Sequence, residues 1–187
     1  MTNDKMTKAE INMNVRLSEH LASPSVAALS HSSELNGLHL SPHFKLGELT
    51  RSKSHPEVYN IPSRVHIENL KRVCVWLEAL RARYNQRYVL AGDEEPIIIT
   101  SGYRSVELNR KVGGVATSNH LTGCAVDIRV AGKEQLIRYA CILLDYADET
   151  KQDFDELLLE HGANGVIWLH FAVRAPNQQN RRKIGFL

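Results

Sequence analysis

Cysteine is scarce in this sequence, and the few that occur exclude the common cysteine-based scaffolds. The three residues Cys74, Cys124 and Cys141 contain no Cys-x-x-Cys pair, so we expect neither a disulfide framework nor a thiolate zinc finger. Long apolar runs are absent as well, since none approaches the roughly eighteen residues that a membrane-spanning helix needs. These absences predict reduced, mostly buried thiols and a chain that does not insert into a membrane.

An excess of one charge sign is also missing. The 23 Lys and Arg residues against 21 Asp and Glu residues give a formal net charge of +2. This composition argues against a polybasic protein that binds nucleic acid. The N-terminal segment is polar and lacks the apolar core of a signal peptide. We therefore expect a product that is cytoplasmic as synthesised.

Length and apolar content are those of a globular chain. With 187 residues, of which 43% are hydrophobic, the chain can bury a core, and its length suits one domain with an arm. Residues 1–42 are expected to form an irregular N-terminal arm, in which residues 8–22 are compatible with a short amphipathic helix. The compact pattern covers residues 43–174, and residues 175–187 are expected to be a polar, solvated tail. We expect a monomer.

Apolar periodicity and turn residues divide the compact region into short helices and strands. Apolar residues at helical spacing predict a long helix from Pro62 to about Tyr84. A second helical pattern places Ile137 and Leu143 on one apolar face. The predicted helices are 44–49, 62–84, 105–112 and 133–147, and the predicted strands are 97–100, 124–130, 155–160 and 166–173. The last two strands are expected to form an antiparallel hairpin.

One segment, residues 118–128, combines a histidine, a glycine turn and an aspartate on a strand. His120 precedes the turn, and Asp127 follows on the strand, where period-two alternation puts it on the same face as Ala125. The opposite face of this strand is apolar and belongs in the core. A charged carboxylate in the middle of such a strand needs a partner. A metal ion and an arginine or loop amide are both compatible with this segment alone.

The last predicted strand supplies a third polar side chain. His170 and Trp168 alternate with Ile167, Leu169 and Phe171, so the histidine lies on the face opposite the apolar residues. Two imidazoles and one carboxylate make a tetrahedral zinc site that leaves one position open for water. An open coordination position indicates catalysis rather than a structural metal clip.

Four blocks of sequence, in order, resemble a known family. Residues 118–127 match the signature Ser-x-His-x-x-Gly-x-Ala-x-Asp, residues 101–105 read Ser-Gly-Tyr-Arg-Ser, and Trp168 and His170 form a closing Trp-x-His. The fourth block is the opening segment, residues 44–52. Over about residues 43–174 the chain resembles the zinc D-alanyl-D-alanine carboxypeptidases and L-alanyl-D-glutamate peptidases, which are peptidoglycan metallopeptidases of the hedgehog-type fold.

The resemblance implies a fold, a cofactor and a substrate. The implied fold is α+β, with a small antiparallel sheet of about four strands and helices packed on one face. The implied zinc (Zn²⁺) ligands are His120, Asp127 and His170. The implied activity is hydrolysis of a peptide bond in peptidoglycan stem peptides, by a carboxypeptidase or an endopeptidase. A phage or prophage lysis enzyme that reaches the cell wall through a holin fits the expected absence of a signal peptide, and so does a cytoplasmic dipeptidase.

The resemblance also assigns substrate contacts. Arg104 would bind the substrate's carboxylate or its polarised carbonyl, because a guanidinium stays charged and presents a planar fork of donors. Its alternative role is a structural salt bridge. Ser118 would donate a hydrogen bond to substrate, or else cap the turn, and Trp168 is expected at the substrate-binding face.

The chain departs from the family at the catalytic carboxylate. Many relatives carry this carboxylate three residues before the last histidine ligand, where this chain has Ile167. The nearest acidic residue is Glu160, at the end of the preceding strand. We predict Glu160 as the general base, with Glu156 as the second candidate on the same face. The substitution at Ile167 keeps open a zinc-containing binding module without turnover, and a phage structural protein whose residues 1–42 dock to a partner is a further alternative.

The position of Glu160 depends on the register of the hairpin. A three-residue loop over 163–165 pairs Glu160 with Trp168, on the face of His170, and makes the apolar faces of the two strands coincide. A two-residue turn would instead pair Glu160 with Leu169 and turn apolar side chains to the polar face, which is costly. The sequence therefore predicts the three-residue loop.

Overall fold

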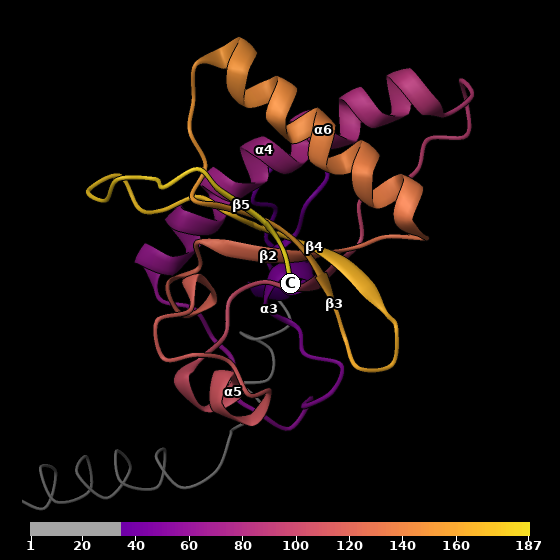
Figure 1. Cartoon of the computed structure of the whole chain (residues 1–187). Helices are drawn as coiled ribbons and strands as arrows, with labels where there is room; N and C mark the ends of the chain where they lie inside the picture. Colours follow the sequence, from indigo (N-terminus) through magenta and orange to yellow (C-terminus); the bar gives the residue numbers. More distant parts are fainter. Residues whose placement is uncertain (1–34) are drawn as a thin grey trace, which may run out of the picture. The chain divides into compact units, whose positions relative to one another are not determined.

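A mixed five-stranded sheet organises the computed structural model, which describes residues 35–187 (Figure 1). The predicted arm helix over 8–22 lies outside the described residues. The strands, in the spatial order β1-β2-β4-β3-β5, are β1 (Ile99–Ser101), β2 (Ala125–Arg129), β4 (Ile167–Ala172), β3 (Glu156–His161) and β5 (Lys183–Phe186). The α+β class predicted from the sequence is confirmed.

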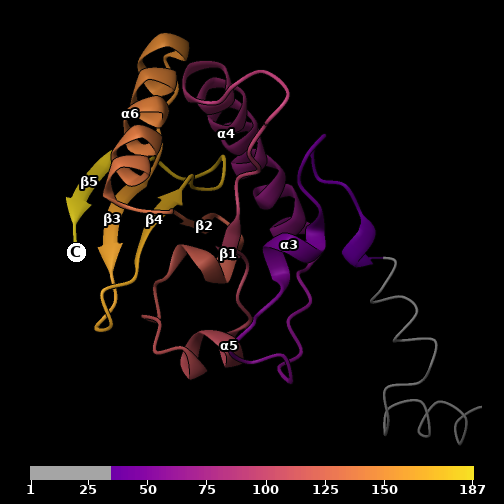
Figure 2. The ribbon, with the colours of Figure 1, turned by 90° about the vertical axis from the view of Figure 1, so that its right-hand side faces the viewer.

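Two long helices cover one face of the sheet, and short helices carry the site-forming loops. The helices are α3 (Leu46–Thr50), α4 (Arg64–Tyr88), α5 (Val106–Lys111), the 3-10 helix η1 (Asn119–Thr122) and α6 (Lys133–Thr150). Figure 2 shows α4 and α6 together on one side of the sheet and α5 on the other. No helix within residues 35–187 combines the length and the apolar character needed to cross a lipid bilayer.

Local capping explains where the helices begin. The Ser63 side chain accepts a hydrogen bond from the His66 backbone N–H, which fixes the start of α4 close to the predicted Pro62. Ser105 accepts from the Leu108 N–H and starts α5, as its N-cap position predicted. These caps satisfy backbone donors that have no partner inside the helix.

The core lies between the sheet and the two long helices. The apolar face predicted for the last strand is buried there: Leu169 and Phe171 are fully buried, and Phe171 packs beside Trp76 of α4 with ring centroids 5.2 Å apart. Val126 and Ile128 of β2 are likewise fully buried. Burial of this face leaves the alternate side chains of β2, β3 and β4 for the opposite face of the sheet.

The C-terminal residues correct the expectation of a purely antiparallel sheet, although most of residues 175–187 are exposed. β5 pairs in parallel with β3, with Lys183 opposite Glu156, and so adds a fifth strand. Arg181, just before it, forms an ion pair with Asp155. The polar composition of this segment gave no strand signal, because an edge strand is held by backbone hydrogen bonds that do not require an apolar pattern.

Candidate active site

Three polar side chains from separate elements converge on one buried point. They are His120 of η1, Asp127 of β2 and His170 of β4, and one potential ligand atom of each lies within 4.8 Å of the others. All three are buried. Asp127 and His170 are direct partners in the antiparallel pairing of β2 with β4. Adjacent strands therefore place these two side chains together, and the preceding turn brings His120 to them.

The turn between His120 and β2 depends on glycine and on a serine cap. Gly123 has a φ of +70°, and a Cβ there would lie 2.6 Å from the His66 carbonyl oxygen, so both the backbone conformation and the space require glycine. The Ser118 hydroxyl accepts a hydrogen bond from the His120 N–H at 3.3 Å. Ser118 thus performs the capping role, while the substrate contact implied for it stays a prediction.

The hydrogen bonds of His120 fix which ring nitrogen faces the cluster. Its Nδ1 lies 2.6 Å from the Gly102 carbonyl oxygen. Because a carbonyl only accepts, Nδ1 carries the hydrogen. Nε2 lies 3.2 Å from Asp127 Oδ1 and 3.3 Å from His170 Nδ1. In the neutral ring, the Nε2 lone pair therefore points into the cluster, as a metal ligand requires.

His170 presents its other nitrogen to the cluster. Its Nδ1 lies 2.9 Å from Asp127 Oδ1, and its Nε2 lies 3.5 Å from Glu156 Oε2. Burial alone would lower the pKa of His170, but the hydrogen bonds to Asp127 and Glu156 raise it to about 9. Burial alone would likewise raise the pKa of Asp127, but the two neighbouring histidines hold it well below its ordinary value.

The donor set fits a zinc ion. Two imidazole nitrogens and one carboxylate oxygen are zinc ligands of the kind found in catalytic sites. The Gly102 carbonyl orients His120 from behind, which is the arrangement that metal-binding histidines usually have. The three residues implied by the sequence signature are therefore the three that the fold brings together.

Arg104 lies against the free side of Asp127. Its Nη2 lies 2.6 Å from Asp127 Oδ2, and its Nε donates to Ser101 Oγ at 2.8 Å. Asp127 therefore faces the histidines with Oδ1 and the guanidinium with Oδ2. The sequence left a metal and an arginine as alternative partners for this aspartate. The geometry accommodates both, one at each carboxylate oxygen.

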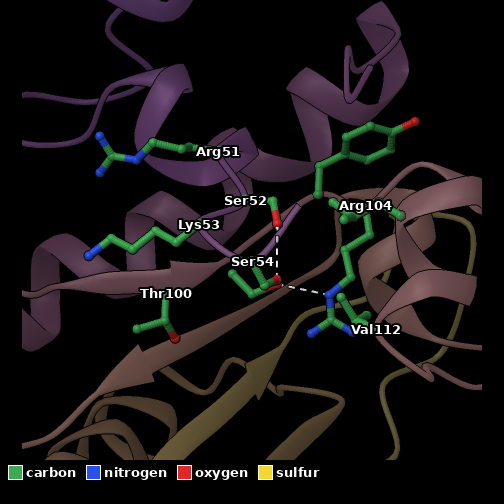
Figure 3. A pocket seen from close by; sticks show the side chains of 10 residues that line it. Arg51, Ser52, Lys53, Ser54, Thr100, Arg104 and Val112 are labelled. Atoms are coloured by element: carbon green, nitrogen blue, oxygen red, sulfur yellow. Dashed lines mark hydrogen bonds between the residues drawn. The ribbon is translucent and has the colours of Figure 1, made fainter. Parts of the chain in front are cut away.

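A cavity of about 280 Å³ opens beside Arg104 (Figure 3). Its lining includes Thr100 and Ser101 of the edge strand β1, and it continues to Arg51 and Lys53 in the segment after α3. In Figure 3 the side chains of Arg51 and Lys53 extend in the same direction, away from the guanidinium of Arg104. The cavity adjoins Asp127 only through Arg104, and its lining combines these cationic side chains with apolar ones such as Leu108 and Val112.

The hairpin has the predicted register. Glu160 pairs with Trp168, and the Gly162 N–H donates to the Val166 carbonyl oxygen at 2.8 Å across the three-residue loop. The Trp168 Nε1–H donates to Glu160 Oε2 at 2.7 Å. The pairing puts Glu160 and Trp168 on the same face of the sheet as His170. The indole thus holds the carboxylate, a role the sequence did not predict for Trp168.

Three residues around the cluster were not singled out by the sequence. Gly102 lies inside the matched Ser-Gly-Tyr-Arg-Ser block, and Asn119 lies inside the histidine signature, so motif membership was the available signal for both. Asn119 Nδ2 donates to Glu156 Oε2 at 2.9 Å. Arg181 lies 2.9 Å from Glu156 Oε1. Only the parallel pairing of β5 brings Arg181 there, and no local pattern indicates that pairing.

Comparison with known proteins gives one family match. A family model described as Peptidase M15 matches residues 42–143. This span contains Arg104, His120 and Asp127 and ends before His170, which the fold adds to the cluster. No curated protein matches the chain.

Proposed function

Because the chain belongs to the peptidase M15 family of zinc-dependent peptidases, we propose that it hydrolyses a peptide bond in peptidoglycan stem peptides. The bond would be of the D-alanyl-D-alanine carboxypeptidase or L-alanyl-D-glutamate endopeptidase type. The observation that carries the proposal is the buried cluster of His120, Asp127 and His170, whose donor atoms lie within 4.8 Å of one another.

Zn²⁺ would be held by His120 Nε2, His170 Nδ1 and an oxygen of Asp127. When bound, such an ion lowers the pKa of a coordinated water and polarises a carbonyl group. The protein's part is to exclude bulk water and to fix the ligands. The His120 ring is oriented by the hydrogen bond from Nδ1 to the Gly102 carbonyl oxygen, and the far nitrogen of His170 lies 3.5 Å from the Glu156 carboxylate.

Glu160 is the proposed general base. Its Oε2 accepts the indole N–H of Trp168, and its position opposite Trp168 puts it on the face of His170. In the proposed reaction the carboxylate takes a proton from the attacking water and delivers it to the leaving amine. The indole bond fixes the side chain and leaves the second carboxylate oxygen for this transfer.

Arg104 is the proposed anion-binding residue. Its guanidinium lies at the border between Asp127 and the cavity of about 280 Å³. A fixed cation at this border would stabilise negative charge that develops on the substrate carbonyl oxygen, or bind a terminal carboxylate. The cavity would accommodate the substrate chain on that side, with Ser118 as a further polar contact.

The proposed setting is the bacterial cell wall. A phage or prophage lysis enzyme, monomeric and without affinity for nucleic acid, agrees with the balanced charge of 23 basic and 21 acidic residues. Its partner is the peptide of peptidoglycan. A zinc-containing binding module remains the alternative that Ile167 favours, because a carboxylate is absent from that position.

Metal content is the first test of the site. We expect near-stoichiometric zinc in the wild-type chain after reloading and desalting, and loss of zinc from His170→Ala, measured by elemental analysis. His161→Ala is the matched control, since this exposed histidine of β3 lies outside the cluster. A wild-type protein that is folded but binds no zinc would overturn the proposed zinc-dependent hydrolysis.

Turnover is the second test. Glu160→Gln should lower kcat by about a hundredfold or more while zinc content stays at the wild-type level, because only the proton acceptor is removed. Hydrolysis is measured on one peptide ending in D-Ala-D-Ala and one containing L-Ala-D-Glu. A zinc-loaded wild-type protein that cleaves neither peptide would favour the binding module.

A further inference from the structure

The far nitrogen of His170 has a carboxylate partner. Nδ1 faces Asp127 and His120, so Nε2, on the opposite side of the ring, points out of the cluster. There it lies 3.5 Å from Glu156 Oε2. The Glu156 side chain is only 14% exposed, which shields this contact from solvent. The carboxylate and the metal-ligating edge therefore occupy opposite sides of one imidazole.

Glu156 is held in place by groups on both of its oxygens. Asn119 Nδ2 donates to Oε2 at 2.9 Å, and Arg181 Nη2 lies 2.9 Å from Oε1. Lys183 Nζ is 3.5 Å from the same Oε1. Glu156 is thus held in a fixed position by donors on both carboxylate oxygens.

Arg181 is itself anchored by a buried charge. Its Nε and Nη2 bind the two oxygens of Asp155 at 2.8 and 2.7 Å, and Asp155 is fully buried. The parallel pairing of β5 with β3 sets Lys183 beside Glu156 and so brings Arg181 to this point. The C-terminal segment reaches the metal cluster through one intervening carboxylate.

We propose that Glu156 is a positioning residue for His170 and that Arg181 holds Glu156 for this task. The inference rests on the proposed zinc site. A carboxylate that accepts from Nε2–H keeps the ring in the tautomer whose Nδ1 lone pair faces the metal, and it raises the basicity of that nitrogen. Glu156 consequently acts through His170 and is excluded as the general base, because it lies at the ring nitrogen remote from the cluster.

The chain offers a matched control beside Arg181. Arg182 is the next residue and carries the same charge, but it pairs with Asp148 and Asp153. Replacing either arginine by alanine removes one positive charge from the same segment. Only Arg181→Ala removes a contact to Glu156.

The experiment measures the zinc dissociation constant by competition with a chelator, together with the visible spectrum of the Co²⁺-substituted protein. Glu156→Ala should weaken zinc binding by about 10- to 100-fold and alter the Co²⁺ bands. Glu156→Gln should weaken binding less, and Arg181→Ala should shift affinity in the same direction. Arg182→Ala should bind zinc as the wild type does.

A separate readout distinguishes positioning from catalysis. At saturating zinc, Glu156→Gln should recover kcat to within about tenfold of the wild type, whereas the kcat of Glu160→Gln should stay lower than that of the wild type by about a hundredfold or more. Wild-type affinity and an unchanged Co²⁺ spectrum in folded Glu156→Ala would overturn the positioning role. If Glu156→Ala does not fold, the same two measurements on Glu156→Gln decide: wild-type zinc affinity and an unchanged Co²⁺ spectrum would overturn the positioning role. A wild-type chain that binds no zinc would overturn the proposed function instead.

Discussion

Gly102 shows how closely the backbone packs behind the site. A Cβ at this position would lie 2.2 Å from the Leu49 carbonyl oxygen, and the same carbonyl accepts the Tyr103 N–H at 2.7 Å. On its other side, the Gly102 carbonyl accepts the Nδ1–H of His120. One residue without a side chain therefore packs against α3 and orients His120.

Replacing Gly102 by alanine should disturb both contacts. We expect Gly102→Ala to lower the free energy of unfolding by about 2–3 kcal/mol, because the new methyl group meets backbone that cannot move aside. Zinc affinity should fall as His120 shifts. Urea unfolding measures the change in stability, and zinc titration measures the change in affinity. Gly132→Ala is the control, since a Cβ there meets nothing within 4 Å; equal midpoints for the two variants would contradict the expectation.

At the residue scale, the sequence predicted the three side chains that converge but not the groups that orient them. His120, Asp127 and His170 were predictable because strand alternation and a glycine turn constrain them locally. The orienting partners were not, because Gly102 uses its backbone carbonyl and Glu156 acts across a strand pairing. Motif membership marks Gly102 but does not say which group its carbonyl oxygen contacts, and no local pattern marks the contact of Glu156.

At the scale of the element, α6 shows what periodicity can and cannot predict. The helix was predicted over 133–147 and covers Lys133–Thr150. Leu143 is fully buried as predicted, whereas Ile137, assigned to the same face, is 55% exposed. Ile137 lies near the start of the helix, beside Phe186 and Leu187 at the edge of the sheet. Periodicity gives the direction of a side chain but not how far the neighbouring layer extends.

The difference between these two residues predicts different costs of truncation. Leu143→Ala should lower the free energy of unfolding by about 2–5 kcal/mol, because it removes buried methyl groups and leaves a cavity. Ile137→Ala should change it by about 0.5 kcal/mol or less, as at other surface positions. Denaturant melts of the two variants measure this. A similar loss of unfolding free energy in the two variants would mean that Ile137, at the exposed end of α6, is buried in solution.

The hairpin and the last strand differ in predictability for a physical reason. The register of β3 with β4 follows from their apolar faces, since a slip by one residue would turn those faces to the polar side. β5 contributes no comparable apolar face, and Ile184 is half exposed. Its pairing depends on backbone hydrogen bonds, such as that from the Lys183 N–H to the Asp155 carbonyl oxygen at 2.9 Å.

At the scale of the whole molecule, the fully buried Asp155 connects segments that are distant in sequence. Its carboxylate accepts from Asn119 of the histidine turn at 2.8 Å and contacts Arg174 at 2.9 Å. Arg181, before the last strand, contacts both of its oxygens. The sequence alone could not place this cluster, because each partner becomes a neighbour only after the sheet has formed.

The Asp155 cluster makes the stability of the whole chain depend on pH. Burial alone would raise the pKa of Asp155, but the hydrogen bonds from Arg181 and Asn119, with the charge of Arg174, lower it below its ordinary value. A carboxyl whose folded pKa is depressed contributes stability above its unfolded pKa of about 3.9 and loses it as the pH falls through the folded pKa.

Asp155→Asn should therefore destabilise the chain in a pH-dependent way. At pH 7 we expect a loss of about 2 kcal/mol, since the hydrogen bonds from Arg181 and the ion pair with Arg174 lose their charged acceptor. Below about pH 4 the difference from the wild type should shrink, because the Asp155 carboxyl of the unfolded wild type takes up a proton while the folded carboxyl, with its lower pKa, stays ionised to lower pH. Urea melts of both zinc-free proteins between pH 3 and 7 measure the difference; a constant gap across this range would mean that Asp155 stabilises the fold through shape and not through charge.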